Sequence, residues 1–388
     1  MGALTGIRVA DFTRVVAGPY ATMLLGDLGA EVIKVERPGK GDDTRTWGPP
    51  FVAGESAYFL SVNRNKKSVC LDLRTEDGRA AARELIARSD VVVENFRPGY
   101  MDSLGLGYEA LRVAQPRLIY CAISAYGQDG PYRDRAGYDV IVSAQAGLMG
   151  ITGTPGGPPV KAGVAVTDMA TGLYALAGIL AALYHRERTG EGQRVDVSLL
   201  SAQLATLLNA AGSYLAAGEV LTPQGSAHAS IVPYQAFRAA DGYIVIGAAN
   251  DKLFGLLSAA LGHPEWASDE RFASNEQRVR HREALVTAIE DALSAGTVAA
   301  WEPRLAQIGV AVAPVNDMAQ VFADPQVAHS GQVVTIEHPT LGPLKLVGPA
   351  LSLSATPPAV SAPPPLVGQH TEEVMRMLST PAAATDAP

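Results

Sequence analysis

Short apolar runs alternate with amphipathic segments through the first third of the chain. The runs predict β-strands at 7–11, 31–36, 67–73, 90–95 and 117–124. The segments between them predict helices at 18–29, 76–88 and 107–113. Strands that alternate with helices usually pair in parallel, with helices on both faces of the sheet. The predicted fold class is therefore α/β, with a Rossmann-like large domain built on a parallel sheet.

The longest apolar stretch covers 169–184 and follows Asp168 directly. It holds sixteen residues without a charge, whereas a membrane span needs about 20, and Arg186 and Arg188 come soon after it. Its Ala, Leu and Gly content suits a helix that packs on several sides. We therefore expect a buried core helix and no membrane, followed by a strand at 192–198 and a helix at 199–216.

The composition changes at 218–233, a polar stretch with Gly and Pro of the kind that joins domains. The pattern after it predicts two strands that meet at 239–242, helices near 251–261, 280–294 and 297–308, and a strand at 309–315. A hairpin at 333–338 and 343–348, a proline-rich extended segment and a short helix at 371–378 follow. The expected domains are 1–217 with 330–388, and a small inserted αβ domain over 218–329. Residues 380–388 are expected to be disordered.

Composition and charge narrow the possible partners. The chain has 388 residues, a formal charge of −8 and no long basic block, so it carries no footprint for nucleic acid. Its two cysteines, Cys70 and Cys121, lie in apolar runs, and the N-terminus lacks the pattern of a signal peptide, which favours a cytoplasmic location. The seven histidines lack metal-binding spacing, so we expect no metal. Small molecules are the expected partners.

Several common catalytic motifs are missing. The turn after the first strand reads "DFTRVVAGP" instead of G-x-G-x-x-G, which disfavours NAD. Neither the nucleophile elbow of hydrolases nor a phosphate-binding P-loop occurs.

Asp168 has two interpretations. Asp is a favoured first residue of helices, so Thr167 or Asp168 can simply cap the long helix. Alternatively, the helix dipole holds a buried carboxylate ionised beside apolar surface, and such a carboxylate is a usable nucleophile.

Polar side chains follow the predicted strands, where ligands bind in open α/β sheets. Asn95, Phe96 and Arg97 offer an amide, an aromatic face and a cation, and Arg37 follows a neighbouring strand. Further cations lie in "NRNKKSV", namely Arg64, Lys66 and Lys67. So many cations in an acidic protein indicate a polyanionic ligand such as a phosphorylated nucleotide carrier. The alternative is a loop with surface arginines.

Seven sequence words resemble the class III family of CoA-transferases, which includes formyl-CoA and carnitine or bile-acid CoA-transferases. They occur in family order from residue 6 to about 375 and read "GIRVADFTRVVAGPYATMLLGDLGAEVIKVERPGKGDDTR", "NRNKKSVCLDL", "VENFRPG", "GQDGPYRDRAGYD", "TDMATGLYA", "TGEGQRVDVSLL" and "PYQAFRAADGYI". The resemblance implies an interlocked homodimer, with CoA as part of an acyl-CoA substrate and no tightly bound cofactor.

The same resemblance implies site residues. Asp168 matches the family's aspartate nucleophile, which would form an acyl anhydride and then a CoA thioester. Tyr138 is expected close to the reacting centre. CoA is expected along the ends of the first strands, near Val16, Ala17, Arg37, Leu71, Arg74, Asn95, Phe96 and Arg97.

Some words separate subgroups of the family. Related racemases carry His in a Gly-His-Asp word, where this chain has Tyr138, so racemisation is disfavoured but stays an alternative, as does a non-catalytic CoA-binding protein. The segment 225–237 resembles members that use dicarboxylic acids, and "KAGVAVTDMATGLYA" is most similar to enzymes for succinate and glutarate. Arg14 and His228 are candidates for binding a remote carboxylate, although either can be an ordinary surface residue.

Overall fold

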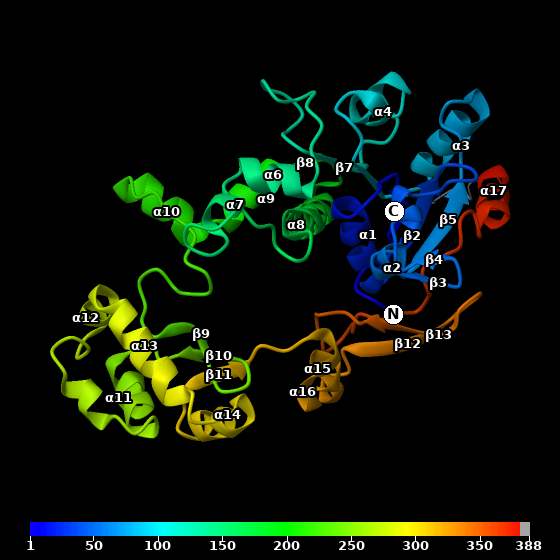
Figure 1. Cartoon of the computed structure of the whole chain (residues 1–388). Coiled ribbons are helices and arrows are strands. Elements are labelled where there is room, and N and C mark those ends of the chain that lie inside the picture. Colours follow the sequence, from blue (N-terminus) through cyan, green and yellow to red (C-terminus); the bar gives the residue numbers. More distant parts are fainter. Residues whose placement is uncertain (381–388) are drawn as a thin grey trace. The chain divides into compact units, whose positions relative to one another are not determined.

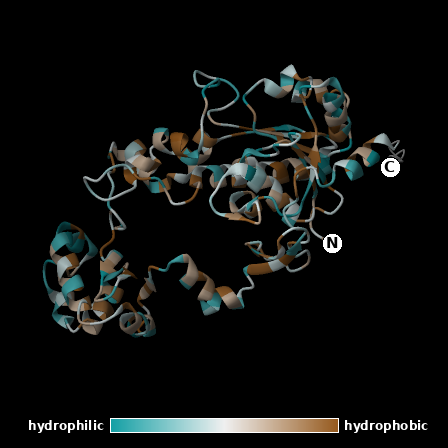
Figure 2. Cartoon of the chain, turned by 45° about the vertical axis from the view of Figure 1, so that its right-hand side comes forward, coloured by the Kyte–Doolittle hydropathy of each residue, from teal (hydrophilic) through white to brown (hydrophobic). Residues whose placement is uncertain are grey.

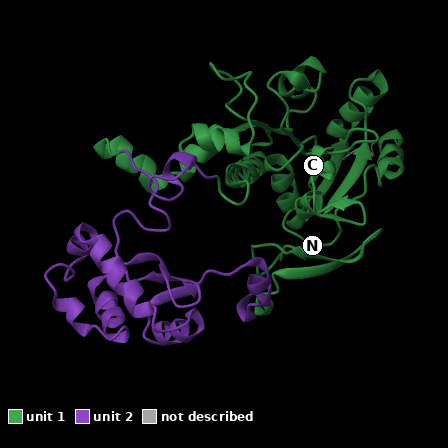
Figure 3. Cartoon of the chain, in the orientation of Figure 1, with its two compact units in different colours: residues 1–148, 161–219, 328–388 green, residues 149–160, 220–327 purple. Residues whose placement is uncertain are grey.

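The chain divides into two compact units, coloured separately in Figure 3. The computed structural model describes residues 1–380. The first unit comprises Met1–Leu148, Lys161–Glu219 and the residues from Ala328 onward, and the second comprises Met149–Val160 and Val220–Val327. The domain boundaries expected from the sequence stay a prediction. Apart from Thr380, the tail expected to be disordered lies outside the described residues.

A six-stranded parallel sheet forms the centre of the first unit (Figure 1). Its strands are β1 (Arg8–Asp11), β2 (Glu31–Glu36), β5 (Lys66–Cys70), β6 (Val91–Glu94), β7 (Ile119–Ser124) and β8 (Arg194–Ser198). They lie in the order β5-β2-β1-β6-β7-β8, and every neighbouring pair is parallel. This is the doubly wound order, which reverses direction between β1 and β6 and opens a crevice at their carboxyl ends. The predicted α/β class and parallel sheet are confirmed.

Two apolar cores lie on the two faces of this sheet. One face packs against α1 (Ala17–Asp27), α6 (Asp139–Gln145), α8 (Val166–Thr189) and α9 (Leu199–Thr206). The other packs against α3 (Glu76–Ala87), α4 (Tyr100–Ser103), α5 (Tyr108–Leu111) and α17 (Thr371–Ser379). Alternation along β6 serves both cores, because Val91 and Val93 enter the first and Val92 the second. The hydropathy colouring of Figure 2 shows the apolar strands between their helices.

Helix α8 is long and apolar enough to cross a membrane by length and composition, a test that core helices also pass. Here it packs on α1, β7, β8 and α9, with Ala175, Ile179 and Ala182 fully buried. Gly172 permits a close approach to α1, since a Cβ at this position would lie 2.7 Å from the carbonyl oxygen of Ala17. This approach brings the N-terminus of α8 beside the start of α1.

The second unit contains the antiparallel sheet β11-β10-β9 and a helical layer. Its strands are β9 (Tyr234–Arg238), β10 (Tyr243–Gly247) and β11 (Ala311–Pro314). Its helices are α11 (Asp251–Ala260), η2 (Pro264–Ser268), α12 (Asn275–Arg280), α13 (Arg282–Leu293), α14 (Val298–Gln307) and α15 (Met318–Ala323). The core includes Phe237, Phe254 and Trp301, and the fully buried Arg278 donates to the carbonyl oxygens of Val232 and Phe272.

Smaller elements complete the chain. They are η1 (Asp43–Thr46), β3 (Phe51–Val52), β4 (Glu55–Ser56), α2 (Ala57–Ser61), α7 (Leu148–Ile151), α10 (Leu208–Ala217), α16 (Pro325–His329), β12 (Val333–His338) and β13 (Gly342–Val347). The predicted hairpin is confirmed as β12 and β13. The single helix predicted at 199–216 is wrong, because it breaks into α9 and α10 at Leu208, whose φ is +41°.

The proline-rich segment near 354–368 forms neither helix nor strand, and Asn65 holds its middle part. The Asn65 side chain donates to the carbonyl oxygen of Ala359 at 2.7 Å and accepts from the backbone N–H groups of Ser361 and Ala362. The Asn65 N–H also donates to the carbonyl oxygen of Ala362.

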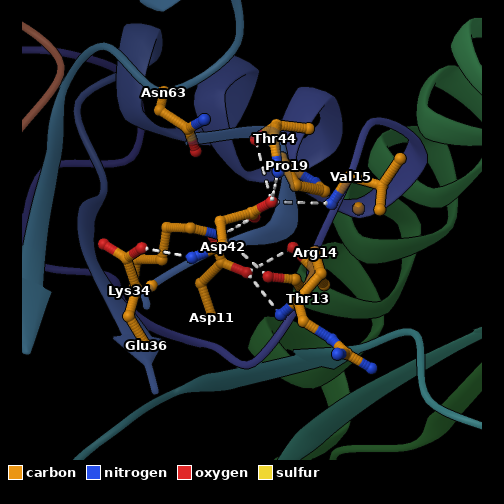
Figure 4. A network of polar contacts seen from close by, with 12 residues as sticks. Asp11, Thr13, Arg14, Val15, Pro19, Lys34, Glu36, Asp42, Thr44 and Asn63 are labelled. Carbon is orange, nitrogen blue, oxygen red and sulfur yellow. Dashed lines mark hydrogen bonds and ion pairs between the residues drawn. The ribbon is translucent and has the colours of Figure 1, made fainter. Parts of the chain in front are cut away.

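A buried charge network, formed by Asp11, Lys34, Asp42 and Lys66, lies at the carboxyl end of β1. Lys66 Nζ is 3.2 Å from Asp11 Oδ2, Lys34 Nζ is 2.9 Å from Asp42 Oδ2, and all four side chains are fully buried. Figure 4 shows Asp42 between Lys34 and the loop that follows β1. Lys34 also donates to the carbonyl oxygen of Thr13 at 2.7 Å. Burial raises the pKa of Asp42, but Lys34 outweighs it and brings the value to about 2.

We expect Lys66→Met to destabilise the protein by about 3–5 kcal/mol, because it leaves the buried Asp11 carboxylate without its cation. Chemical denaturation at pH 7, followed by circular dichroism, measures this loss. Lys67→Met is the matched control, since Lys67 is one-third exposed and pairs with Glu31 and Glu373. Loss of these exposed ion pairs should lower the free energy of unfolding by about 1 kcal/mol or less. Equal losses in the two variants would contradict the role given to the network.

Candidate active site

Two adjoining cavities open at the crevice where the strand order reverses. The Asp168 cavity has a volume of about 320 Å³ and is lined by the ends of β6 and β7, the loop after β1 and the first turn of α8. The Arg37 cavity has a volume of about 560 Å³ and lies over the ends of β1, β2 and β5. Arg14, Phe96 and Arg97 belong to the walls of both. One ligand can therefore extend through both.

Asp168 is fixed by its own backbone. It is the third residue of α8, and its N–H donates to Asp139 Oδ1 at 3.1 Å. The capping interpretation is wrong, because the N-cap position before Val166 is occupied by Ala165 and no side chain caps the helix. The Asp168 side chain thus remains available to the cavity, with an exposed fraction of 8% for the residue.

The electrostatics of Asp168 depend on its burial and on a neighbouring carboxylate. Burial raises its pKa to about 7, and the negative charge of Asp139 adds to the effect. Among the ion pairs of residues 1–380, none involves Asp168. The hypothesis that the helix dipole holds this carboxylate ionised stays a prediction, and burial and Asp139 act against it. At neutral pH the group is divided between its acid and its carboxylate.

The loop after β1 is held in one conformation beside Asp168. Asn95 Oδ1 accepts from the N–H of Arg14 at 2.9 Å, and Asn95 Nδ2 donates to the Arg14 carbonyl oxygen at 2.7 Å. Val15 follows with φ at +71°, a strained value for a β-branched residue, and its N–H donates to Asp42 Oδ1 at 3.3 Å. The buried charge network thus reaches the wall of the Asp168 cavity.

The structure places every predicted site residue at one of the two cavities. Those at the Asp168 cavity, besides Asp168 itself, are Val16, Ala17, Asn95, Phe96, Arg97 and Tyr138. Those at the Arg37 cavity are Arg37, Leu71, Arg74, Phe96 and Arg97. The amide of Asn95 was expected to face a ligand, but both of its polar atoms form hydrogen bonds with the backbone of Arg14.

The predicted cations differ in their availability. Arg37 pairs with Asp43 and Arg74 with Asp72, whereas the Arg97 side chain is exposed and has no polar partner among residues 1–380. Glu94 supports the turn that carries Arg97, because its Oε2 accepts from the N–H of Phe96 at 2.8 Å.

The prediction that Arg64, Lys66 and Lys67 bind a polyanion is wrong. They precede or begin β5, so they do not lie at the carboxyl end of that strand. Arg64 pairs with Asp27 at 2.6 Å, Lys66 belongs to the buried charge network, and Lys67 pairs with two glutamates. These cations neutralise charges of the protein itself.

Sequence analysis missed several residues of the site. Arg133 and Arg135 line the Asp168 cavity from the loop before α6. Tyr58 lines neither cavity, but burial raises its pKa and the charges of Asp168 and Asp139 raise it further, so its phenol interacts electrostatically with both carboxylates. The arginines carried a signal, since "YRDRAGYD" sets two cations before Tyr138. Nothing in the sequence pointed to Tyr58.

Groups that would hold a metal or act as a histidine base are not found at this site. Within residues 1–380 there is no group of three or more His, Cys, Asp or Glu side chains placed to bind an ion. The described lining of the Asp168 cavity contains no histidine. The candidate reacting group in that cavity is the carboxyl of Asp168.

Known proteins of similar sequence and structure match this chain over nearly its whole length. Human succinyl-CoA:glutarate CoA-transferase is 48% identical over 373 residues, which cover 96% of this chain and 85% of the human protein. Succinate–glutarate CoA-transferase of Agrobacterium fabrum is 43% identical and covers 97% of this chain and 96% of that protein. The crystal structure of a CAIB/BAIF family protein from Brucella suis matches with a TM-score of 0.88 at 42% identity, and the match covers 97% of this chain and 99% of that one. The family model of CoA-transferase family III matches residues 4–371, and the chain belongs to this family as a class III CoA-transferase.

Proposed function

We propose that this enzyme moves CoA from succinyl-CoA to a dicarboxylic acid such as glutarate, with Asp168 as the covalent nucleophile. The observation that carries the proposal is the position of Asp168, which is buried, has no ion-pair partner in the described chain and lies in the wall of a cavity that adjoins a second, cation-lined cavity. Two similar proteins named for succinate and glutarate support the choice of acids.

The Arg37 cavity has the chemistry to bind CoA. Arg37, Lys40, Arg74 and Arg97 supply cations for phosphate groups. Apolar wall, which includes Leu71 and Phe96, suits the adenine ring and the pantetheine chain. Since Phe96 and Arg97 border both cavities, a thiol end of CoA that passes them enters the space beside Asp168.

The reaction then proceeds by exchange of acyl groups on Asp168. A carboxylate oxygen attacks the thioester carbonyl of the donor, the C–S bond breaks, and a mixed anhydride forms with release of the CoA thiolate. The thiolate attacks the Asp168 carbonyl carbon, which frees the donor acid and leaves an aspartyl-CoA thioester. The acceptor acid repeats both steps in reverse order. The burial of Asp168 excludes water, which would hydrolyse either intermediate.

The environment of Asp168 suits a nucleophile. Its raised pKa makes the ionised form more basic, and a more basic carboxylate attacks a carbonyl more readily. The N-termini of α1 and α8 lie at the same cavity, so their dipoles favour the negative charge that develops on the attacked oxygen.

Two other functions have less support. A racemase of this fold would need an acid and a base on opposite sides of the α-carbon, and the described wall of the Asp168 cavity offers no histidine for that role. A non-catalytic CoA-binding protein would have no use for an unpaired carboxylate at a cost in stability.

We also propose that the protein is a homodimer. Helix α10 has no buried residue, although Leu208, Tyr214 and Leu215 are apolar and largely exposed. An apolar helix of this kind is stable in water when another surface covers it. Light scattering on the purified protein should therefore give twice the monomer mass. A monomeric mass across micromolar concentrations would contradict this proposal.

Replacement of Asp168 should abolish transfer. We expect Asp168→Asn and Asp168→Ala to lower the transfer rate by at least ~10⁴-fold, as for other covalent nucleophiles, and to leave CoA binding intact. In the wild type, succinyl-CoA followed by hydroxylamine should leave a hydroxamate on Asp168, which peptide mass spectrometry detects. Glu187→Gln, an exposed change on the same helix, is the matched control. Transfer by a clean Asp168→Ala preparation would refute the nucleophile.

A stability measurement separates lost chemistry from lost folding. The pKa of Asp168 is higher in the folded protein than in the unfolded chain, so ionisation of this carboxyl costs stability as pH rises from about 4 to about 7. Asp168→Asn should thus melt at a higher temperature than the wild type above pH 7 and lose this advantage near pH 4.

The rate should rise with pH. Because only the carboxylate of Asp168 attacks, kcat/KM should increase about tenfold per pH unit below 7 and level off above about 8. Asp139→Asn keeps an oxygen for the Asp168 N–H but removes the neighbouring negative charge, so the midpoint should move to lower pH. Rates measured from pH 5 to 9 test both statements, and a midpoint that stays in place or rises would count against them.

A further inference from the structure

Arg14 has an incomplete set of partners at the Asp168 cavity. Its Nε is buried and has no hydrogen-bond partner among residues 1–380, and its Nη1 lies 3.4 Å from Asp43 Oδ2, a long contact. The guanidinium lies 4.9 Å from the centre of the Phe96 ring. The side chain as a whole is about one-third exposed, and the long contact with Asp43 is the one polar contact of its head group among residues 1–380. The accessible N–H groups of the guanidinium are therefore available to an acceptor in the cavity.

The backbone of Arg14 is fixed, although its head group is not saturated. Asn95 holds both its N–H and its carbonyl oxygen, and the neighbouring residues Thr13 and Val15 are tied to the buried charge network. The backbone from which the side chain extends therefore does not have to be ordered when an anion binds. Pre-organised arginines of this kind favour planar, two-pronged binding of a carboxylate.

Asp168 itself is not the acceptor. No ion pair joins Arg14 to Asp168 within the described residues, and the pKa of Asp168 is raised by burial and Asp139 with no cation as an opposing cause. One cavity thus holds a carboxyl to be acylated and, away from it, a cation with free donors. A substrate with a carboxylate at each end matches this pair.

The other arginines of this cavity are less suited to the task. Arg133 already donates to the carbonyl oxygen of Gln128 at 2.9 Å and to Asp134 at 3.1 Å. Arg135 is exposed and stacks on Tyr132 at 3.8 Å. Arg97 is exposed and also borders the Arg37 cavity, where phosphates would compete for it.

We propose that Arg14 binds the remote carboxylate of the acyl group and thereby selects dicarboxylic over monocarboxylic substrates. This rests on the proposed function and assigns its specificity to one residue. Asp43 orients the guanidinium of Arg14. Its carboxylate pairs with Arg14 on one side and with Arg37 of the neighbouring cavity on the other. The remote carboxylate replaces that long contact with shorter, charge-assisted hydrogen bonds.

The test compares substrates that differ only in the remote carboxylate. Succinyl-CoA and butyryl-CoA form one pair, and glutaryl-CoA and pentanoyl-CoA form the other. For each, the second-order rate constant of the first half-reaction is measured as release of one equivalent of free acid in a single turnover, in the wild type and in Arg14→Gln. We expect Arg14→Gln to lower the value about 100-fold for succinyl-CoA and glutaryl-CoA and to leave the two monocarboxylic thioesters within about threefold.

Two further measurements separate this role from others. Binding of free CoA, measured by calorimetry, should be unchanged in Arg14→Gln, and Arg14→Lys should recover part of the succinyl-CoA rate because it keeps the charge. Arg112→Gln, an exposed arginine paired with Glu109 on α5, is the control and should match the wild type. Arg135→Gln tests the rival cation.

Each outcome decides between the proposals. A loss that is equal for both members of a substrate pair, a weaker binding of free CoA, or a selective loss in Arg135→Gln instead of Arg14→Gln would overturn the role of Arg14 alone. If the wild type uses butyryl-CoA as well as succinyl-CoA, the dicarboxylate function falls, and the role of Arg14 falls with it.

Discussion

Two buried lysine–aspartate pairs at the carboxyl ends of β1 and β2 determine the geometry of the crevice. Buried ions are stable only when paired and hydrogen-bonded, so Asp11, Lys34, Asp42 and Lys66 accept few alternative arrangements. The same groups hold Thr13 and Val15 through their backbones. The loop that carries Arg14 and leads into α1 therefore begins from a rigid base. Its strained Val15 is tolerated because the surrounding contacts leave it no other conformation.

The burial of Asp168 favours the proposed reaction and opposes the ionisation that the reaction needs. A carboxylate attacks a thioester only where water is excluded, but exclusion of water disfavours the carboxylate itself. No ion pair among residues 1–380 relieves this, and Asp139 increases the effect. Other buried carboxyls of this unit pair with a lysine or an arginine, as Asp11 does with Lys66. Glu94 is likewise buried without an ion pair among residues 1–380, and burial raises its pKa to about 8. Asp168 differs from Glu94 because it lines the cavity where the reaction is proposed to occur.

The sequence predicted the fold well where one rule decides the outcome. The central strands β6 and β7 are buried along their whole length, so their apolar runs are nearly continuous and easy to recognise in the sequence. The long apolar stretch of α8 is recognisable in the same way. The break at Leu208 was missed, because a positive φ at a leucine has no local signal. The residues of the site were predicted from their positions at strand ends and from the family resemblance. The sequence did not predict which cations face a ligand. Arg64 differs from Arg37 because it pairs with Asp27, a partner that is distant in sequence.

The closure of the first unit by its own C-terminal segment has a consequence for synthesis. Helix α17 supplies Val374 and Leu378 to the second core of the sheet, and Asn65 fastens the segment near 359–362 that leads to it. Both come after the whole second unit in the chain. On the ribosome, the part of this face that α17 covers therefore stays exposed until the second unit and α17 have been synthesised. The second unit, in contrast, is contiguous apart from 149–160. All of its core residues have been synthesised before α17.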